Sequence, residues 1–345
     1  MKKNIWVSMF AVLLVVFMLA ACAPANLSGE ETPSQESTAV ESPSADTETA
    51  SAETSAAAAG YKAAFITQAL SNESQAYAWK QFQQYCGEYG FEMDVFEGQN
   101  DVQNEAKAVS TCIAQGYNVI FINPSDINAI VPSLMEAKEA GLIIGMFSSD
   151  LPPASQQYRD FFCGVDDTMA GQTAGQAFLD KFPDGATIVE VGGQAGHDAQ
   201  IKRHDGFMKA IEGSNITLLD TQNCNGWVTA DAMAITEDFI TKYGDQIQGV
   251  FCHWDNGATG VIEALKNANM TDVFVVGVDG CRAGFDQVKA GSQAVCIGQS
   301  FTNMAIKSLE NAKAALTGGT YEAVNFIPLD VVTAENIDTF PYPEW

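Results

Sequence analysis

From residue 62 onward, short runs of apolar and β-branched residues alternate with longer stretches in which apolar residues recur at helical spacing. In the first of these stretches Phe82 and Tyr85 share a helical face with Ala78, and Gly90 follows as a stop signal. This alternation predicts parallel sheets flanked by helices, an α/β fold. The expected strands are residues 63–67, 92–96, 119–122, 143–147, 187–191, 249–252, 273–278 and 294–298.

The first 22 residues follow a different pattern. Lys2 and Lys3 precede an apolar run over residues 5–21, which is too short and too early for a membrane-spanning helix, and small residues then lead to Cys22. This is the layout of a signal peptide, and the order Leu-Ala-Ala-Cys resembles the lipobox of bacterial lipoproteins. The resemblance implies a signal peptide over residues 1–21 and a lipidated Cys22, whose acyl chains, such as palmitate, anchor the protein to the cell membrane. A plain secretory signal with an incidental cysteine is the alternative.

Residues 22–60 are expected to form a disordered acidic linker behind that cysteine. The segment after Cys22 consists mainly of Ser, Thr, Ala, Glu and Pro and contains no Lys or Arg. It has too few large apolar residues to bury a core. We therefore interpret it as a spacer between the lipid and the folded part of the chain.

The composition narrows the class of partner. The chain has 345 residues, of which 47% are hydrophobic, so it can fold around cores in about two domains. The formal net charge of -26 argues against nucleic acid and anionic membrane faces as partners.

Seven cysteines remain besides Cys22, and no two cysteines have CxxC spacing. Their odd number, and the position of several inside apolar runs, favours buried free thiols over a disulfide framework. These cysteines are Cys86, Cys112, Cys163, Cys224, Cys252, Cys281 and Cys296.

Polar residues gather directly after the expected strands, where the loops of parallel sheets meet ligands. Each set taken alone also fits a helix N-cap. Six such sets in one chain favour a shared cleft. The sets lie within residues 68–75, 123–126, 148–150, 192–197, 253–256 and 279–282.

Several of these stretches, in this order, resemble the type I periplasmic-binding-protein family, with the ribose- and galactose-type solute-binding proteins of ABC transporters as the nearest branch. The matching stretches are residues 122–126 (INPSD), Gly206-Phe207 after Arg203, residues 277–280 (GVDG) and residues 328–333 (PLDVVT). The resemblance covers about residues 61–338, nearly the whole folded part.

The resemblance implies two Rossmann-like lobes with parallel sheets, joined by a three-strand hinge near residues 163–167, 297–300 and 329–333. The first lobe would take residues 61–163 plus 300–328, and the second residues 164–299 plus 329–345. Family members bind a solute between the lobes, which close on it. We therefore expect an extracytoplasmic, monomeric sugar- or polyol-binding lipoprotein that serves ABC permease subunits and uses no cofactor, metal or nucleic acid. The alternative is the ligand-binding component of a chemosensory or two-component signalling system.

Some positions keep the residue types with which the family holds its ligand. Asn72, Asp255, Asp279 and Gln299 are polar where the family hydrogen-bonds sugar hydroxyls, and Trp227 is aromatic where the family stacks a ring on the sugar. Carboxylates and amides can each hold two hydroxyls. A flat ring covers the C–H face of a sugar and excludes water.

Other positions depart from the family's pattern and argue against ribose itself. Ser148 and Ser149, followed by Asp150, replace an Asp-Arg pair, and Ile201 replaces a second arginine. Ser74 and Gln75 replace paired aromatics, and Trp254 replaces an asparagine. The changes remove two cations and move the aromatic surface. Trp227 and Trp254 are therefore hypothesised to sandwich a larger ring, such as a hexopyranose, an inositol or a nucleoside.

No catalytic constellation is recognisable in the sequence. There is no GxxxxGK[ST] loop, no HExxH pair and no GxSxG elbow, so no enzyme activity is predicted. Asp166 and Asp167 precede a helical stretch and are explained by capping and by the helix dipole. Arg203 is expected to pair with an acidic neighbour in the second lobe, whereas Arg282 could lie in the site or at its rim.

Overall fold

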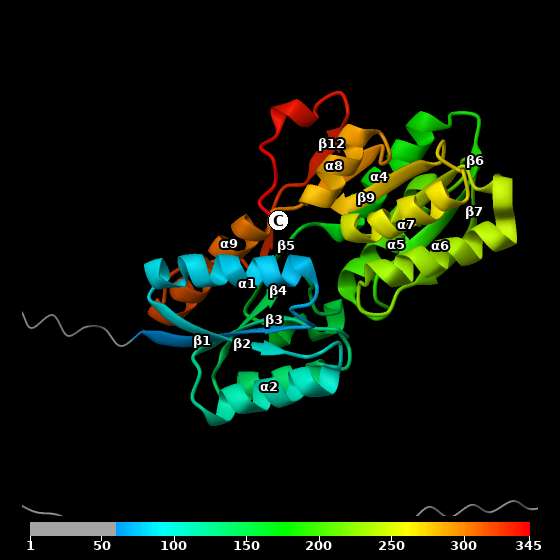
Figure 1. Ribbon diagram of the computed structural model, residues 1–345. Helices are drawn as coiled ribbons and strands as arrows, with labels where there is room; N and C mark the ends of the chain where they lie inside the picture. The colour runs from blue at the N-terminus through cyan, green and yellow to red at the C-terminus, as the bar shows by residue number, and fades with distance from the viewer. Residues whose placement is uncertain (1–59) are drawn as a thin grey trace, which may run out of the picture. The chain divides into compact units, whose positions relative to one another are not determined.

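The computed structural model describes residues 60–345. The predicted signal peptide, Cys22 and all but the last residue of the predicted linker lie outside these residues. Within the described part the strands form two six-stranded sheets, and helices pack on both faces of each (Figure 1). We call the first sheet with its helices the first lobe, and the second sheet with its helices the second lobe.

The first sheet has the strand order β11-β5-β4-β3-β1-β2, and all its pairings are parallel. Its strands are β1 (Tyr61–Thr67), β2 (Phe91–Glu97), β3 (Val119–Asn123), β4 (Ile143–Phe147), β5 (Phe161–Gly164) and β11 (Val324–Phe326). The helices of this lobe are α1 (Glu73–Tyr85), α2 (Val102–Ala114), α3 (Val131–Glu139) and α9 (Phe301–Thr317), with 3-10 turns at Cys86–Tyr89 and Pro153–Tyr158.

Two apolar clusters cover the two faces of this sheet, because successive side chains of a buried strand point to opposite faces. Phe65 and Phe121 pack with α1 and α9 on one face. Ile66 and Ile120 pack with α2 and α3 on the other. The inner strands β1, β3 and β4 are therefore buried on both sides, and their polar residues are confined to the strand ends.

The second sheet has the strand order β12-β10-β9-β8-β6-β7, in which only β12 is antiparallel to its neighbour. Its strands are β6 (Ala186–Gly192), β7 (Ile216–Asn223), β8 (Gly249–Cys252), β9 (Phe274–Asp279), β10 (Val295–Gly298) and β12 (Asp330–Thr333). The helices of this lobe are α4 (Asp167–Lys181), α5 (Asp198–Ile211), α6 (Thr229–Tyr243), α7 (Asp255–Asn267) and α8 (Arg282–Ala290), with 3-10 turns at Gly244–Gln246 and Ile337–Thr339.

Helices α4 and α5 lie close together because each has a glycine that faces the backbone of the other helix. A Cβ atom on Gly171 would lie 2.1 Å from the carbonyl oxygen of Arg203, and one on Gly206 would lie 2.1 Å from that of Thr168. Neither position can therefore hold a larger residue without moving a helix. This packing sets Arg203 beside Asp167.

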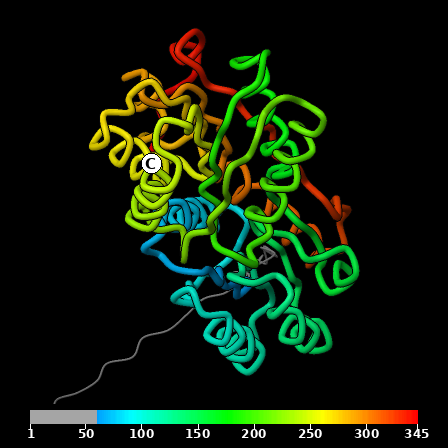
Figure 2. The backbone as a smooth tube through the Cα atoms, turned by 90° about the vertical axis from the view of Figure 1, so that its right-hand side faces the viewer, coloured from blue at the N-terminus to red at the C-terminus, as the bar shows by residue number. Residues whose placement is uncertain are grey.

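The chain passes between the lobes three times, after β5, after β10 and between β11 and β12. Figures 1 and 2 both show the cyan elements of the first lobe and the yellow helices of the second lobe as separate groups. The two α/β lobes, their mostly parallel sheets and the three crossings agree with the predicted fold. Each of the eight predicted strands is present.

The last residues of the chain contact both lobes. The backbone carbonyl of Trp345 accepts from the amide of Arg282 in α8 at 2.5 Å. The Trp345 ring stacks on Tyr77 of α1, with centroids 5.6 Å apart, and packs edge-on against Phe301 of α9. This carboxyl-terminal segment therefore adds side-chain contacts between the lobes beside the hinge.

Candidate ligand-binding site

The carboxyl ends of the strands of both lobes meet at one cavity. Most of its lining side chains are amides, hydroxyls or aromatic rings, and they come from both lobes. The lining residues are Gln68, Asn72, Ser74, Gln75, Asn123, Ser148 and Phe301 of the first lobe, His197, Ala199, Arg203, Trp227, Trp254 and Asp279 of the second lobe, and Gln299 at the β10–α9 crossing.

The resemblance implied ten ligand-contacting residues: Asn72, Gln75, Ser148, Ser149, Asp150, Trp227, Trp254, Asp255, Asp279 and Gln299. Seven of them line this cavity. They are Asn72, Gln75, Ser148, Trp227, Trp254, Asp279 and Gln299. Ser149 is fully buried next to Ser148 and bonds across to the second lobe, as described below. Asp150 and Asp255 are not among the lining residues, and both have partners within their own lobes.

Asp150 is held by Arg159 of the same lobe. Its Oδ1 lies 2.5 Å from Arg159 Nε, and its Oδ2 lies 2.8 Å from Arg159 Nη2. Gln156 and the amide of Leu151 donate to the same carboxylate. Both charged side chains are buried, with exposed fractions of 6% for Asp150 and 4% for Arg159. This geometry ties the carboxylate to the loop after β4.

Asp255 is fully buried and supports the loop that follows β9. Its carboxylate accepts from the amide of Gly280 and from Gln293 Nε2, both at 2.8 Å, and the Cys296 thiol lies 3.0 Å away. Burial raises the pKa of this carboxyl group above its ordinary value. Through Gly280 it fixes the backbone next to Asp279, which does line the cavity.

Asp279 carries the carboxyl group on the cavity wall. Gln299 Nε2 donates to its Oδ1 at 2.7 Å. Burial is the main cause that raises the pKa of Asp279, and the guanidinium of Arg203 acts in the opposite direction. The residue has a backbone φ of 139°, which residues other than glycine rarely adopt. Strained backbone of this kind persists where the surrounding structure enforces it, often at ligand sites.

Trp227 and Trp254 do not form the parallel sandwich that was hypothesised from the sequence. Their ring centroids are 5.5 Å apart and their planes meet at 85°, so the two rings form a corner. Each ring lies against a glycine, Trp227 over Gly193 and Trp254 over Gly257. A Cβ atom at either glycine would clash with the indole. The rings are fixed edge-to-face, a favoured arrangement for aromatic pairs.

Arg203 lines the cavity with its charge already paired, as the sequence predicted. Its Nε lies 2.8 Å from Asp167 Oδ1, and its Nη1 donates to the backbone carbonyl of His253. The guanidinium also lies 5.9 Å from the centroid of the Trp227 ring. Arg282, in contrast, is bonded through its amide and Nε to the carboxyl-terminal segment and does not line the cavity.

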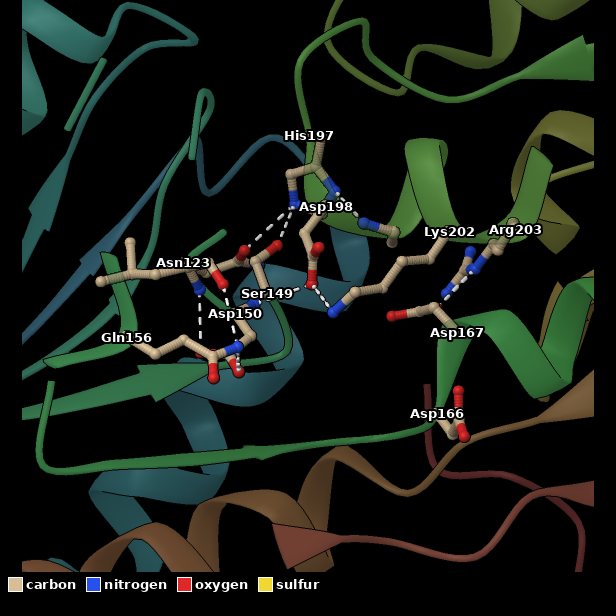
Figure 3. Close-up of polar contacts among 12 residues, drawn as sticks. Asn123, Ser149, Asp150, Gln156, Asp166, Asp167, His197, Asp198, Lys202 and Arg203 are labelled. Carbon is tan, nitrogen blue, oxygen red and sulfur yellow. Dashed lines mark hydrogen bonds and ion pairs between the residues drawn. The ribbon is translucent and has the colours of Figure 1, made fainter. Parts of the chain in front are cut away.

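His197 was noted in the sequence only as part of a loop, yet it connects the two lobes. Its Nε2 lies 2.8 Å from Ser149 Oγ and 3.1 Å from Asn123 Oδ1, both in the first lobe (Figure 3). Asp198 beside it accepts from the amide of Asp150 at 2.8 Å. The polar set that includes His197 was recognised in the sequence, but the contact across the lobes was not.

Gln68 and Asn123 also line the cavity and were not selected from the sequence as ligand residues. Gln68 follows β1, and Asn123 is the last residue of β3. They belong to the polar sets noticed after the strands, so position after a strand was the signal that could have found them.

A second cluster of buried polar side chains is centred on Glu190 of β6. Glu190 is paired with His253 at 2.8 Å and with His204 at 2.7 Å, and these hydrogen bonds lower the pKa of the carboxyl group to about 2 against the opposing effect of burial.

Within residues 60–345 no group of His, Cys, Asp and Glu side chains is arranged to hold a metal ion. The seven cysteines of these residues are unpaired. No helix in the same range has the length and apolar character needed to cross a bilayer.

Comparison with known proteins places this geometry in a family. Residues 63–320 match the family described as periplasmic binding protein domain. The ribose import binding protein of Escherichia coli is 27% identical over 253 residues, which are 73% of this chain and 84% of that protein. The xylitol-binding protein of Mycolicibacterium smegmatis is 28% identical over 245 residues, which are 69% of this chain and 68% of that protein.

Solved structures share the fold at lower identity. A solute-binding protein of an ABC transporter from Bacillus halodurans, with bound myo-inositol, has a TM-score of 0.76 and 23% identity, and the match covers 81% of this chain and 97% of that one. A galactofuranose-binding protein has a TM-score of 0.76 and 21% identity over 81% of this chain and 96% of that one.

Proposed function

This chain belongs to the periplasmic binding protein family, and from that premise we propose that it binds a sugar or a similar polyhydroxylated molecule between its two lobes. Members of the family bind substrates and are not enzymes. The observation that carries the proposal is the cavity whose wall is built from both lobes and lined by amides, hydroxyls, one carboxyl group and two indole rings.

The chemistry of the wall suits a neutral ligand rich in hydroxyl groups. Asn72, Gln75, Ser148 and Gln299 offer donors and acceptors in one place. Arg203 brings the nearest cation, but Asp167 already neutralises it. An anionic ligand would therefore meet no unpaired positive charge among the lining residues. The relatives named for ribose, xylitol and myo-inositol support the same class of ligand.

Binding across two lobes couples ligand affinity to hinge closure. A ligand that bonds to both lobes at once stabilises the closed arrangement over the open one, which shifts the population toward closure. We infer that closure is the event a transporter detects. The relatives support a role as the solute-binding component of an ABC importer.

The proposed location follows from residues outside the described part. Cys22 and the small residues before it resemble a lipobox, so we propose that the mature protein is held at the outer face of the cell membrane by lipid on Cys22. Expression of the Cys22→Ala variant in its host tests this. The variant is expected in the soluble extracytoplasmic or culture fraction, and retention of the variant in the membrane would contradict the anchor.

Ligand binding is tested with the chain that lacks residues 1–22, by melting temperature and calorimetry against D-ribose, D-galactose, D-xylose, xylitol and myo-inositol. A ligand at about 100 times its Kd adds about 2.7 kcal/mol and raises Tm by a few degrees. The variant that tests the cavity is Gln299→Ala, which removes one amide of the cavity wall and should weaken binding about tenfold. Absence of a shift with all five compounds at high millimolar concentration would contradict the proposal.

A further inference from the structure

A short set of polar contacts beside the ligand cavity joins the two lobes. In the first lobe the contacting residues are Asn123, Ser149 and Asp150. In the second lobe they are His197 and Asp198, which begin α5. These residues are at least 96% buried. Figure 3 shows the imidazole of His197 reaching across to Ser149 and Asn123.

The hydrogen bonds define which ring nitrogen of His197 carries the proton. Nδ1 accepts from the amide of Ala199 at 3.2 Å, as an N-cap side chain does, so it carries no proton. Nε2 must then carry the proton and donate it to Ser149 Oγ and Asn123 Oδ1. The contact between the lobes therefore uses the proton on Nε2, and the N-cap bond to Nδ1 requires that the same imidazole be neutral.

We propose that His197 is a positioning residue for ligand binding, whose neutral imidazole fastens the second lobe to Ser149 and Asn123 in the closed arrangement. This inference rests on the proposed function and deepens it. His197 acts through the position of the lobe that carries Trp227, Arg203 and Asp279, because the imidazole lies between this lobe and the first.

Charged groups on every side of the ring bear on its protonation. On α5, the positive charges of Lys202 and Arg203 disfavour protonation of the His197 ring, whereas the negative charge of Asp198 favours it. On α4, Asp167 neutralises Arg203. The remaining acids near the contact are Asp126, whose carboxylate lies against Gly196, Asp150, which is paired with Arg159, and Asp279 on the cavity wall.

Burial, followed by the charges of Arg203 and Lys202, lowers the pKa of His197 to about 3 in the closed arrangement. When the lobes separate, water reaches the ring and its pKa rises toward the ordinary value of about 6.5. The closed form then binds fewer protons than the open form between these two values. Closure is therefore fully supported above about pH 6.5 and is weakened as the pH falls below it.

The effect of Asp198 on closure changes with pH in the opposite direction. It therefore has to be separated from the effect of His197. Burial is the main cause that raises the pKa of its carboxyl group to about 6, although Lys202 and the amide of Asp150 act against this. A raised pKa in the closed form means that closure takes up a proton, which favours closure as the pH falls. The net pH profile of the wild type therefore contains two opposing contributions, and only a ratio between matched variants isolates His197.

The experiment compares wild type with His197→Asn across pH. Asparagine keeps the N-cap of α5 but does not titrate and is too short to span the lobes. The Kd of the best-bound of the five named compounds is measured by calorimetry at pH 7.5 and pH 5.0. The ratio of the wild-type Kd to the variant Kd should rise by up to about 30-fold between these pH values, because only the wild type must release the imidazole proton to close.

Two further variants keep the test decisive. His204→Asn removes a histidine on the same helix that does not line the cavity, and it should leave the pH profile as in the wild type. Ser149→Ala removes one acceptor in the first lobe without changing any titrating group, and it should weaken binding about fivefold at pH 7.5. In nitrogen-15 spectra of the ligand-bound protein at pH 5.0, the wild type should show a signal of a neutral Nε2–H imidazole that the His197→Asn variant lacks.

The outcomes separate this inference from the proposed function. A ratio that changes less than about twofold, together with a Ser149→Ala variant that binds as tightly as the wild type, overturns the role of His197 while leaving ligand binding intact. Absence of binding to the wild type with every compound overturns the proposed function and, with it, the inference that rests on it.

Discussion

Arg203 and Asp167 form an ion pair that joins α5 to α4 next to the ligand cavity. Arg203 Nε lies 2.8 Å from Asp167 Oδ1, and the exposed fractions of the two side chains are 3% and 1%. Gly171 and Gly206 allow the helices to approach closely enough for this contact. A positive charge therefore lies at the cavity wall without being available to attract an anion.

Removing one partner of this pair should cost stability. Asp167→Asn leaves the Arg203 guanidinium buried without its counter-charge, which typically lowers the free energy of unfolding by about 3–5 kcal/mol. Urea unfolding measures the change. The matched control is Glu310→Gln in the exposed pair with Lys307, which should leave the free energy of unfolding nearly unchanged. Equal effects of the two substitutions would contradict the structural role of the buried pair.

Asp150 should prove more important for folding than for contact with ligand. Asp150→Ala removes the partner of Arg159 and is expected to lower the free energy of unfolding by about 3–5 kcal/mol. Stability and Kd are measured on the same preparation, at a temperature at which the variant is folded. A variant with unchanged Tm and lost binding would show instead that Asp150 contacts the ligand, as the sequence resemblance implied.

Trp227 should contribute affinity through its ring face. Replacing the indole by leucine keeps an apolar side chain but removes the aromatic surface, and it should weaken binding about three- to tenfold. Quenching of tryptophan emission by ligand, if present in the wild type, should decrease in the Trp227→Leu variant. The comparison is Trp79→Leu on α1, a tryptophan that does not line the cavity and should leave affinity unchanged.

Asp279 should make stability fall as the pH rises. Burial raises the pKa of this carboxyl group in the folded protein. Its contribution to stability is therefore fully present below the ordinary pKa of about 4, and it is lost as the pH rises through the folded-state value. Asp279→Asn should melt at a higher temperature than the wild type near pH 8, and the difference should shrink near pH 5.

Melting curves at several pH values check this expectation for Asp279. Asp338→Asn at an exposed position serves as the control, and its Tm should differ from that of the wild type by the same small amount at every pH. Parallel curves for Asp279→Asn as well would count against a buried carboxyl group with a raised pKa.

The sequence predicted the fold well where burial leaves a strong pattern. Strands such as β3, buried at every residue, are continuous apolar runs and were found. The edge strand β7 was missed because its half-exposed residues mix polar and apolar types without a clean alternation. β11 was missed because it has three residues, two of them exposed.

Prediction of the site depended on where each side chain finds its partners. Asp150, Asp255 and Asp279 look alike in the sequence, since each follows a strand. Asp150 meets Arg159, and Asp255 meets Cys296, 41 positions along the chain, so both are occupied within their lobes. Only Asp279 lines the cavity. The role of His197 depends on the distance between two lobes, which no local pattern records.

The connectivity of the first lobe constrains the order in which the chain can fold. Cys163 of β5 pairs with Asn325 of β11, so the first sheet gains its edge strand only when residues 324–326 are present. Strands β6 to β10, in contrast, come from the continuous stretch of residues 186–298. Contacts between distant residues form slowly, because the intervening chain must first be brought together. The lobe that begins first in the sequence is therefore completed late, after most of the other lobe's sheet is available. Until α9 has been synthesised and has packed on the sheet, the apolar side chains of Phe65, Phe82 and Phe147 stay partly exposed. The growing chain is therefore prone to aggregation.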